Sequence, residues 1–159
     1  LESWTIEAII NEAFTKDLPH ASAVKIESPK RSFIETIAPM IHSPVRTPAE
    51  GILIDQPWGK LTWLASRELG NSTTMTFGRV IIPAGQTNPR HRHPNCDEIL
   101  HLLSGRLEHS LGDETFLLNP GDTISIPAGQ WHNARTLDGV DAEMVICFSS
   151  ADRQTEFEG

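Results

Sequence analysis

Two histidines and a glutamate near the middle of the sequence have a spacing that suits metal binding. One residue separates His91 from His93. Because side chains alternate between the two faces of a β-strand, a His-x-His pair on a strand directs both imidazoles to the same side. Glu98 follows Pro94 and Asn95, residue types that favour a turn over a continuous strand. We therefore expect the chain to turn here, so that Glu98 begins the next strand and faces the two histidines.

A third imidazole comes from much further along the chain. His132 follows Pro127-Ala128-Gly129, a turn signal that would redirect the chain. With His91, His93 and Glu98 it makes a set of four ligands for one divalent transition metal. Neutral imidazoles and a carboxylate suit Mn, Fe, Co, Ni, Zn or Cu, and these ligand types do not select one metal. An isolated histidine pair is more often a surface or packing feature, but this pair comes with two further ligands and with spaced glycines.

The glycines and the proline around these residues make the pattern more specific. The two segments read Gly85-x5-His91-x-His93-x4-Glu98-x6-Gly105 and Gly121-x5-Pro127-x-Gly129-x2-His132. They resemble the first and second motifs of the cupin family. The resemblance implies a barrel called a double-stranded β-helix or jelly roll, with the metal site in its interior. One position departs from the family pattern: Thr136 stands where the second motif often has Asn, and this loosens any inference about the substrate.

Short strands are the elements expected around the motifs. Apolar and β-branched runs bounded by turn signals predict strands over residues 51–55, 59–66, 73–82, 98–103, 107–111, 115–118, 123–126, 131–135 and 142–148. With Glu98 facing the interior, alternation places Leu100 and Leu102 inside as well, and it places His101 outside, away from the metal. The strand pattern thus predicts an all-β barrel over residues 51–150.

The two ends of the chain are expected to differ from the barrel. Apolar residues at helical spacing, with Ser3 as N-cap, predict an N-terminal helix over residues 3–15. We interpret the proline-rich stretch 17–50 as an extended arm that packs on the barrel or on a second subunit, with disorder as the alternative. Residues 151–159 form a polar tail expected to fray. Since cupins commonly pair through barrel edges and such an arm, the resemblance implies a homodimer.

Composition limits the partners. A net charge of −8 argues against nucleic-acid binding. The sequence has no apolar run near the roughly 18 residues of a membrane span and no signal-peptide pattern. Two cysteines, Cys96 and Cys147, do not make a disulfide framework. We therefore expect a cytoplasmic protein with a small-molecule substrate or ligand, and no nucleic-acid or membrane partner.

Candidate substrate-binding residues flank the ligands. Arg90 and Arg92 could pair with a carboxylate, although solvated loop charges are an equally good interpretation of both. Thr136 is expected to face inward with His132, and Met75 or Thr76 is expected to line the pocket. His109, between charged Glu108 and polar Ser110, is given no functional role. No Lys or Tyr stands beside the ligands as a general base, so the sequence names no catalytic residue.

Three functions remain open at this point. The first is a metal-dependent enzyme that acts as a Lewis acid on a small oxygenated substrate, as an isomerase, cyclase, lyase or decarboxylase would. The second is an Fe(II)-dependent dioxygenase. The third is a non-enzymatic cupin that binds or senses a small molecule.

Overall fold

The regular structure of residues 44–159, the part of the chain that the computed structural model describes, is almost entirely β. Within these residues the one helical element is a short 3-10 turn, η1 (Pro48–Glu50). This confirms the all-β prediction for the barrel. The helix predicted over residues 3–15 and the arm up to residue 43 lie outside the described residues, so the homodimer also stays a prediction. Residues 44–159 contain no helix with the length and apolar character that crossing a bilayer requires.

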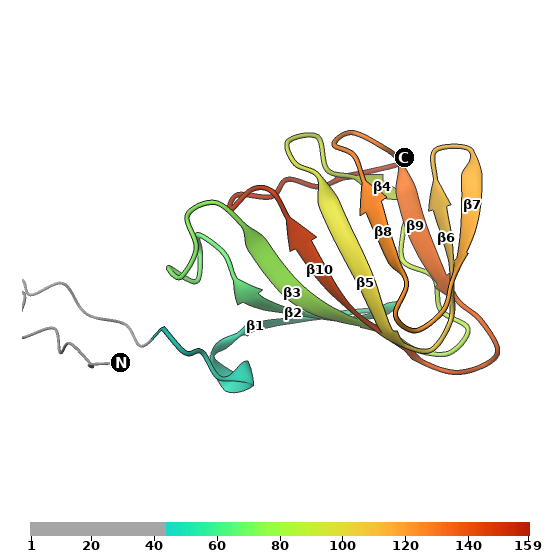
Figure 1. Ribbon diagram of the computed structural model, residues 1–159, viewed down its shortest axis with the longest axis horizontal. Coiled ribbons are helices and arrows are strands. Elements are labelled where there is room, and N and C mark those ends of the chain that lie inside the picture. The colour runs from blue at the N-terminus through green and yellow to red at the C-terminus, as the bar shows by residue number, and fades with distance from the viewer. Residues whose placement is uncertain (1–43) are drawn as a thin grey trace, which may run out of the picture. The chain divides into compact units, whose positions relative to one another are not determined.

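The strands form two antiparallel sheets (Figure 1). The six-stranded sheet has the order β1-β2-β3-β10-β5-β8, and the five-stranded sheet has the order β11-β4-β9-β6-β7. The strands of the first are β1 (Ile52–Gln56), β2 (Gly59–Ala65), β3 (Thr76–Ile82), β10 (Ala142–Phe148), β5 (Glu98–Ser104) and β8 (Thr123–Ile126). Those of the second are β11 (Glu156–Phe157), β4 (His91–Arg92), β9 (His132–Thr136), β6 (Leu107–Leu111) and β7 (Glu114–Leu118). Strands distant in sequence are thus neighbours, as β10 between β3 and β5 shows.

Alternation along the central strands builds the core. In β10, every second residue from Ala142 to Phe148 is buried. In β5, Glu98, Leu100 and Leu102 are buried, whereas Ile99 is exposed. His101 faces the other way, with its Nδ1 2.8 Å from the hydroxyl of Thr123. The predicted direction of this strand is therefore confirmed, and His101 lies outside the interior.

Gly105 in the first motif has a structural reason. Its φ is 78°, a left-handed conformation that L side chains rarely adopt. A Cβ atom at this position would lie 2.3 Å from the carbonyl oxygen of Asp141. The turn from β5 to β6 therefore requires glycine, because both the backbone conformation and the available space exclude a side chain.

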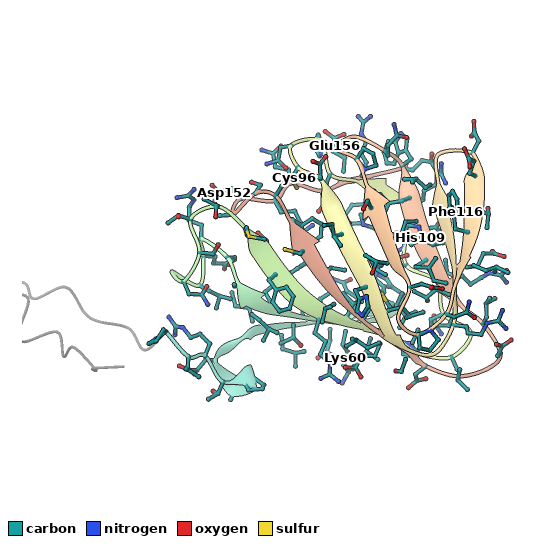
Figure 2. The ribbon with its side chains drawn as sticks, viewed as in Figure 1. Lys60, Cys96, His109, Phe116, Asp152 and Glu156 are labelled. Atoms are coloured by element: carbon teal, nitrogen blue, oxygen red, sulfur yellow. The ribbon has the colours of Figure 1, made fainter. Side chains whose placement is uncertain are left out.

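Residues 151–159 are ordered, which corrects the expectation of a frayed tail. Glu156 and Phe157 form β11, and they pair with Arg92 and His91 of β4. The side chain of Asn95 donates to the carbonyl of Asp152 and accepts from the N–H of Gln154, both at 2.9 Å. Figure 2 shows Asp152, Cys96 and Glu156 at one end of the barrel, with Lys60 at the other. This order could not be predicted from the polar composition of the segment, because backbone groups and one asparagine side chain make the contacts.

Candidate metal centre

The four predicted ligands converge from both sheets. His91 of β4 lies opposite His132 of β9 in the five-stranded sheet, and His93 follows β4 directly. Glu98 is the first residue of β5 in the six-stranded sheet. The chain turns at Pro94 and Asn95 between them, as predicted. One ligand atom from each side chain lies within 4.8 Å of the others, so the group could hold a metal ion.

Backbone ties hold the two motifs against each other. The N–H of Gly129 donates to the carbonyl of His93 over 2.8 Å. The N–H of Ala128 donates to the carboxylate of Asp97 over 2.9 Å. The Pro-x-Gly turn before His132 is therefore fixed on the connection that carries His93 and precedes Glu98, and this fixes the third imidazole relative to the other ligands.

Each of the three imidazoles is held by a backbone carbonyl at its Nδ1 atom. The distances are 2.8 Å from His91 to Pro89 O, 2.7 Å from His93 to Gln154 O and 2.9 Å from His132 to Gln130 O. Because a carbonyl oxygen only accepts, Nδ1 must carry the proton in the neutral ring. Each Nε2 then has a free lone pair. Metal-binding histidines are typically oriented in this way, through a hydrogen bond from the nitrogen that does not bind the metal.

The inner atoms of the group are buried and lack hydrogen-bond partners. These atoms are Nε2 of His93, Nε2 of His132 and Oε2 of Glu98. Oε2 lies 3.2 Å from the first nitrogen and 3.3 Å from the second. When the rings are neutral with Nδ1 protonated, both Nε2 atoms and the carboxylate oxygen are acceptors, so they cannot satisfy one another, and leaving them unpaired costs about 1–3 kcal/mol each. A cation between them would satisfy all three, so the residues fit a bound metal.

The ionisation of the group also suits a cation. Burial lowers the pKa of His91 to about 4, and the positive charge of a protonated His132 would lower it further. Burial alone would raise the pKa of Glu98, but hydrogen bonds and positive charge from His132 and His93 in their protonated form outweigh it and hold that pKa at about 2. Near pH 7, His91 is therefore neutral and Glu98 is ionised, the states in which imidazole and carboxylate bind metals.

The ligands lie in the wall of a cavity of about 460 Å³. Most of the remaining wall is apolar and comes from the six-stranded sheet, including Leu61, Trp63, Val80, Ile82, Leu100, Met144, Ile146 and Phe148. The polar wall outside the ligand set includes Asn88, His109, Arg153 and Thr155. The cavity therefore combines one cluster of metal-binding groups with an apolar surface.

His109 of β6, which the sequence analysis gave no role, is a cavity residue (labelled in Figure 2). It is 1% exposed, and its ring stacks on that of His132 with an interplanar angle of 10° and centroids 5.8 Å apart. Its Nδ1 is buried without a hydrogen-bond partner. Burial lowers the pKa of His109 to about 4. A sequence signal existed, because His109 shares its strand face with Leu107 and Leu111.

Arg90 and Arg92, predicted to bind substrate, do not line the cavity. They alternate with His91 and His93 and so point away from the interior. Arg90 donates to the carbonyl of Gly112 over 2.8 Å and forms an ion pair with Glu158. Arg92 lies 2.7 Å from a carboxylate oxygen of Glu156, and its guanidinium lies over the ring of Trp131.

The other predicted pocket residues serve the structure around the site. The Thr136 hydroxyl donates to the carbonyl of Pro83 over 3.0 Å, and that of Thr76 donates to the carbonyl of Ser150 over 2.7 Å. Met75 is 46% exposed. The arginine that does line the cavity is Arg153, from the segment that the sequence analysis interpreted as a frayed tail. Nothing in the sequence pointed to Arg153, because the pairing of β11 with β4 could not be predicted from it.

Comparison with known proteins agrees with this architecture. Residues 78–148 match the family model described as Cupin domain. Germin-like protein 3-8 of Oryza sativa subsp. japonica is 32% identical over 50% of this chain and 38% of its own length. Polyketide synthase CurC of Streptomyces cyaneus is 31% identical over 57% of this chain and 59% of its own length. Quercetin 2,3-dioxygenase of Bacillus subtilis is 38% identical over 42% of this chain and 20% of its own length. The chain thus spans less than two thirds of each of these relatives.

Solved structures show the same fold. Oxalate oxidase in complex with glycolate has a TM-score of 0.59 and 25% identity, covering 65% of this chain and 57% of that one. Oxalate decarboxylase from Bacillus subtilis has a TM-score of 0.63 and 20% identity, covering 69% of this chain and 30% of that one. The Bacillus enzyme contains Mn(II) centres.

Proposed function

This chain belongs to the cupin superfamily, and on that premise we propose that it is a metal-dependent enzyme acting on a small oxygenated molecule. His91, His93, Glu98 and His132 would hold one divalent transition metal. The observation that carries the proposal is the set of buried ligand atoms without partners, at the wall of an apolar cavity. The three carbonyl-held imidazoles support it, because they present Nε2 inward without any rearrangement.

The cavity residues suggest how such an enzyme would work. A metal bound there supplies Lewis-acid polarisation of a carbonyl or hydroxyl oxygen. Ionised Glu98 would reduce the charge of a divalent ion to about +1, while the neutral imidazoles leave it unchanged. The apolar wall would contact the carbon skeleton and exclude water. A volume of about 460 Å³ lies in the range of small-molecule sites, roughly 300–1,000 Å³.

His109 is the candidate for proton transfer. Among the described cavity residues, it is the imidazole outside the ligand set. Burial lowers its pKa to about 4, so the ring is neutral near pH 7 and has a free nitrogen lone pair, although it is a weaker base than an exposed histidine. Isomerase, cyclase, lyase and decarboxylase chemistry all require such a transfer beside a polarised oxygen. We favour this class of reaction.

A second candidate is an Fe(II)-dependent dioxygenase. The 38% identity with quercetin 2,3-dioxygenase favours it, although that match covers 68 residues. Both candidates use the same four ligands. They differ in the metal and in the need for O2.

Elemental analysis tests the proposal and separates the candidates. The protein is prepared without chelators and under nitrogen, beside His91→Ala and the outward control His101→Ala. We expect about one metal per chain in the wild type and the control, and a small fraction of that in His91→Ala. Iron together with substrate-dependent O2 uptake would favour the dioxygenase, and manganese, nickel or zinc without O2 uptake would favour Lewis-acid chemistry. Failure of the wild type to bind any of these metals on titration would refute the proposal.

A further inference from the structure

Arg153 differs from the other arginines of the described chain in having no carboxylate partner. Residues 44–159 contain eight arginines, and seven of them form an ion pair with Asp or Glu. Arg153 is the eighth, and it is the one that lines the cavity. Burial lowers the pKa of Arg153, and the charge of Glu98 offsets this only in part, since the two side chains form no ion pair. A partly buried guanidinium without a counter-ion is costly unless a ligand supplies one.

The guanidinium of Arg153 is held in place by aromatic rings. Its central carbon lies 4.6 Å from the ring centroid of Trp63 and 5.0 Å from that of Phe148. Nη1 contacts the hydroxyl of Thr155 and lies 3.5 Å from Nδ1 of the ligand His93. Nε is buried and has no hydrogen-bond partner. The planar group is therefore oriented before any ligand binds, and it retains donors that protein atoms do not use.

The charge of the cavity favours an anion. Of the Asp, Glu, Lys and Arg side chains in the described chain, those that line the cavity are Glu98 and Arg153. Their charges cancel, so a bound divalent ion would leave the cavity at about +2. An anion entering this cavity would be attracted by the net charge of the metal site and Arg153, whereas a neutral molecule would gain only the weaker interactions of its dipoles with these charges.

We propose that Arg153 binds the carboxylate of a small organic acid whose carbon skeleton packs on the apolar wall. This names a substrate class for the proposed function and rests on that function for the role of the cavity. An Arg–carboxylate contact is directional, because the guanidinium offers paired donors to the two oxygens. Trp63 and Phe148 hold the guanidinium, and neighbouring wall residues such as Val80 and Ile146 contact the aromatic or aliphatic part of the acid.

Calorimetric titration with matched probes tests the assignment. The probes are benzoate, phenylacetate and hexanoate, each compared with its neutral amide. The proteins are the wild type, Arg153→Met and Arg92→Met, all loaded with Mn(II). Arg92→Met is the matched control, since Arg92 also stacks on an aromatic ring but points away from the cavity. We expect at least one carboxylate to bind the wild type and Arg92→Met about tenfold or more tightly than Arg153→Met, with the amides unaffected.

Three results would overturn the assignment. One is equal carboxylate affinity in the wild type and Arg153→Met, and a second is an equal loss for the carboxylates and their amides. The third is that none of the three carboxylates binds the wild type at concentrations up to about 10 mM, because a weaker interaction would be too weak to support the assignment. Arg153→Lys covers the case in which Arg153→Met does not fold. It keeps the charge without the paired donors, so it should retain part of the preference for carboxylate over amide, and loss of the whole preference would count against the assignment.

Metal content, measured on the same samples, separates this inference from the proposed function. Arg153→Met should keep its metal, because Arg153 is not one of the four ligands. A wild type that binds no metal but still prefers carboxylates through Arg153 would refute the metal-dependent function and leave this inference standing. A wild type that binds metal but whose carboxylate affinity does not depend on Arg153 would refute this inference and leave the metal-dependent function standing.

Discussion

The five-stranded sheet places imidazoles in the cavity, whereas the six-stranded sheet places apolar side chains there. His91 of β4, His132 of β9 and His109 of β6 all come from the smaller sheet. The larger sheet contributes most of the apolar wall and a single acidic group, Glu98. Both sheets obey the same alternation of inward and outward residues. They differ in what occupies the inward positions.

This difference separates the residues that stabilise the barrel from the residues that could bind a metal or transfer a proton. The apolar inward residues of β10 and β5 belong to the buried core of the barrel, so substitutions that change their volume or polarity should cost stability. His91 and His132 are the first residues of β4 and β9, where backbone carbonyls of the preceding loops hold them. A rigid apolar wall can therefore be kept while the polar groups facing it change, which is how one fold accommodates different chemistries.

The largest effect should come from removing an imidazole of the five-stranded sheet. His132→Ala removes a ligand and leaves Glu98 with one neighbouring imidazole fewer. We expect metal affinity to fall by at least about a hundredfold, since even the loss of groups that merely orient ligands costs 10–100-fold. Metal titration followed by elemental analysis measures the change, with His101→Ala as control. Unchanged affinity in His132→Ala would break the contrast between the sheets.

Truncation in the six-stranded sheet should affect stability instead. Leu102 of β5 is fully buried, and Leu102→Ala should lower the free energy of unfolding by about 2–5 kcal/mol. Leu103→Ala is the matched control, because its side chain is 44% exposed, and it should change stability by about 0.5 kcal/mol or less. Urea unfolding measures both. The metal bound per folded chain should stay at the wild-type value, and a loss of metal from folded Leu102→Ala would show that support and chemistry are not separate.

A pH dependence sharpens the comparison, because between pH 7 and about 5 it comes mainly from the imidazoles. The pKa of His109 falls from 6.5 to about 4 on folding, so between these values the unfolded chain binds the proton more readily. The stability contributed by neutral His109 is therefore present above pH 6.5 and is lost as the pH falls toward 4, by up to about 3 kcal/mol. Urea unfolding of the metal-free protein at pH 7 and pH 4 measures the loss. His109→Phe should lose less stability than the wild type between pH 7 and pH 4. An equal loss would show that His109 does not cause this pH dependence.

The smallest effect should come from an outward position on a strand that also carries a ligand. Arg135 of β9 forms an exposed ion pair with Glu108 at 2.8 Å. Arg135→Gln should change stability by about 1 kcal/mol or less, less still at high salt, and should leave metal content unchanged. Thermal unfolding at low and high salt measures it. A large loss of metal would mean that the two faces of β9 are not independent.

Local spacing determined the core of the candidate metal site. His91-x-His93, the turn at Pro94 and the alternation after Glu98 set the direction of each side chain, because direction along a strand depends on position alone. The motifs likewise predicted the barrel and the inward face of β9 from the sequence. These features required no knowledge of which strands pair.

Only the tertiary structure decided what faces the metal site across the cavity. The carbonyl that holds His93 belongs to Gln154, and the two residues are 61 positions apart. Arg153 enters the cavity because β11 pairs with β4, and His109 is a cavity residue because β6 lies next to β9. Such contacts depend on pairing between distant segments, which periodicity within one segment does not specify. The sequence alone therefore led to the four candidate ligands, whereas the cavity around them became visible only in the folded chain.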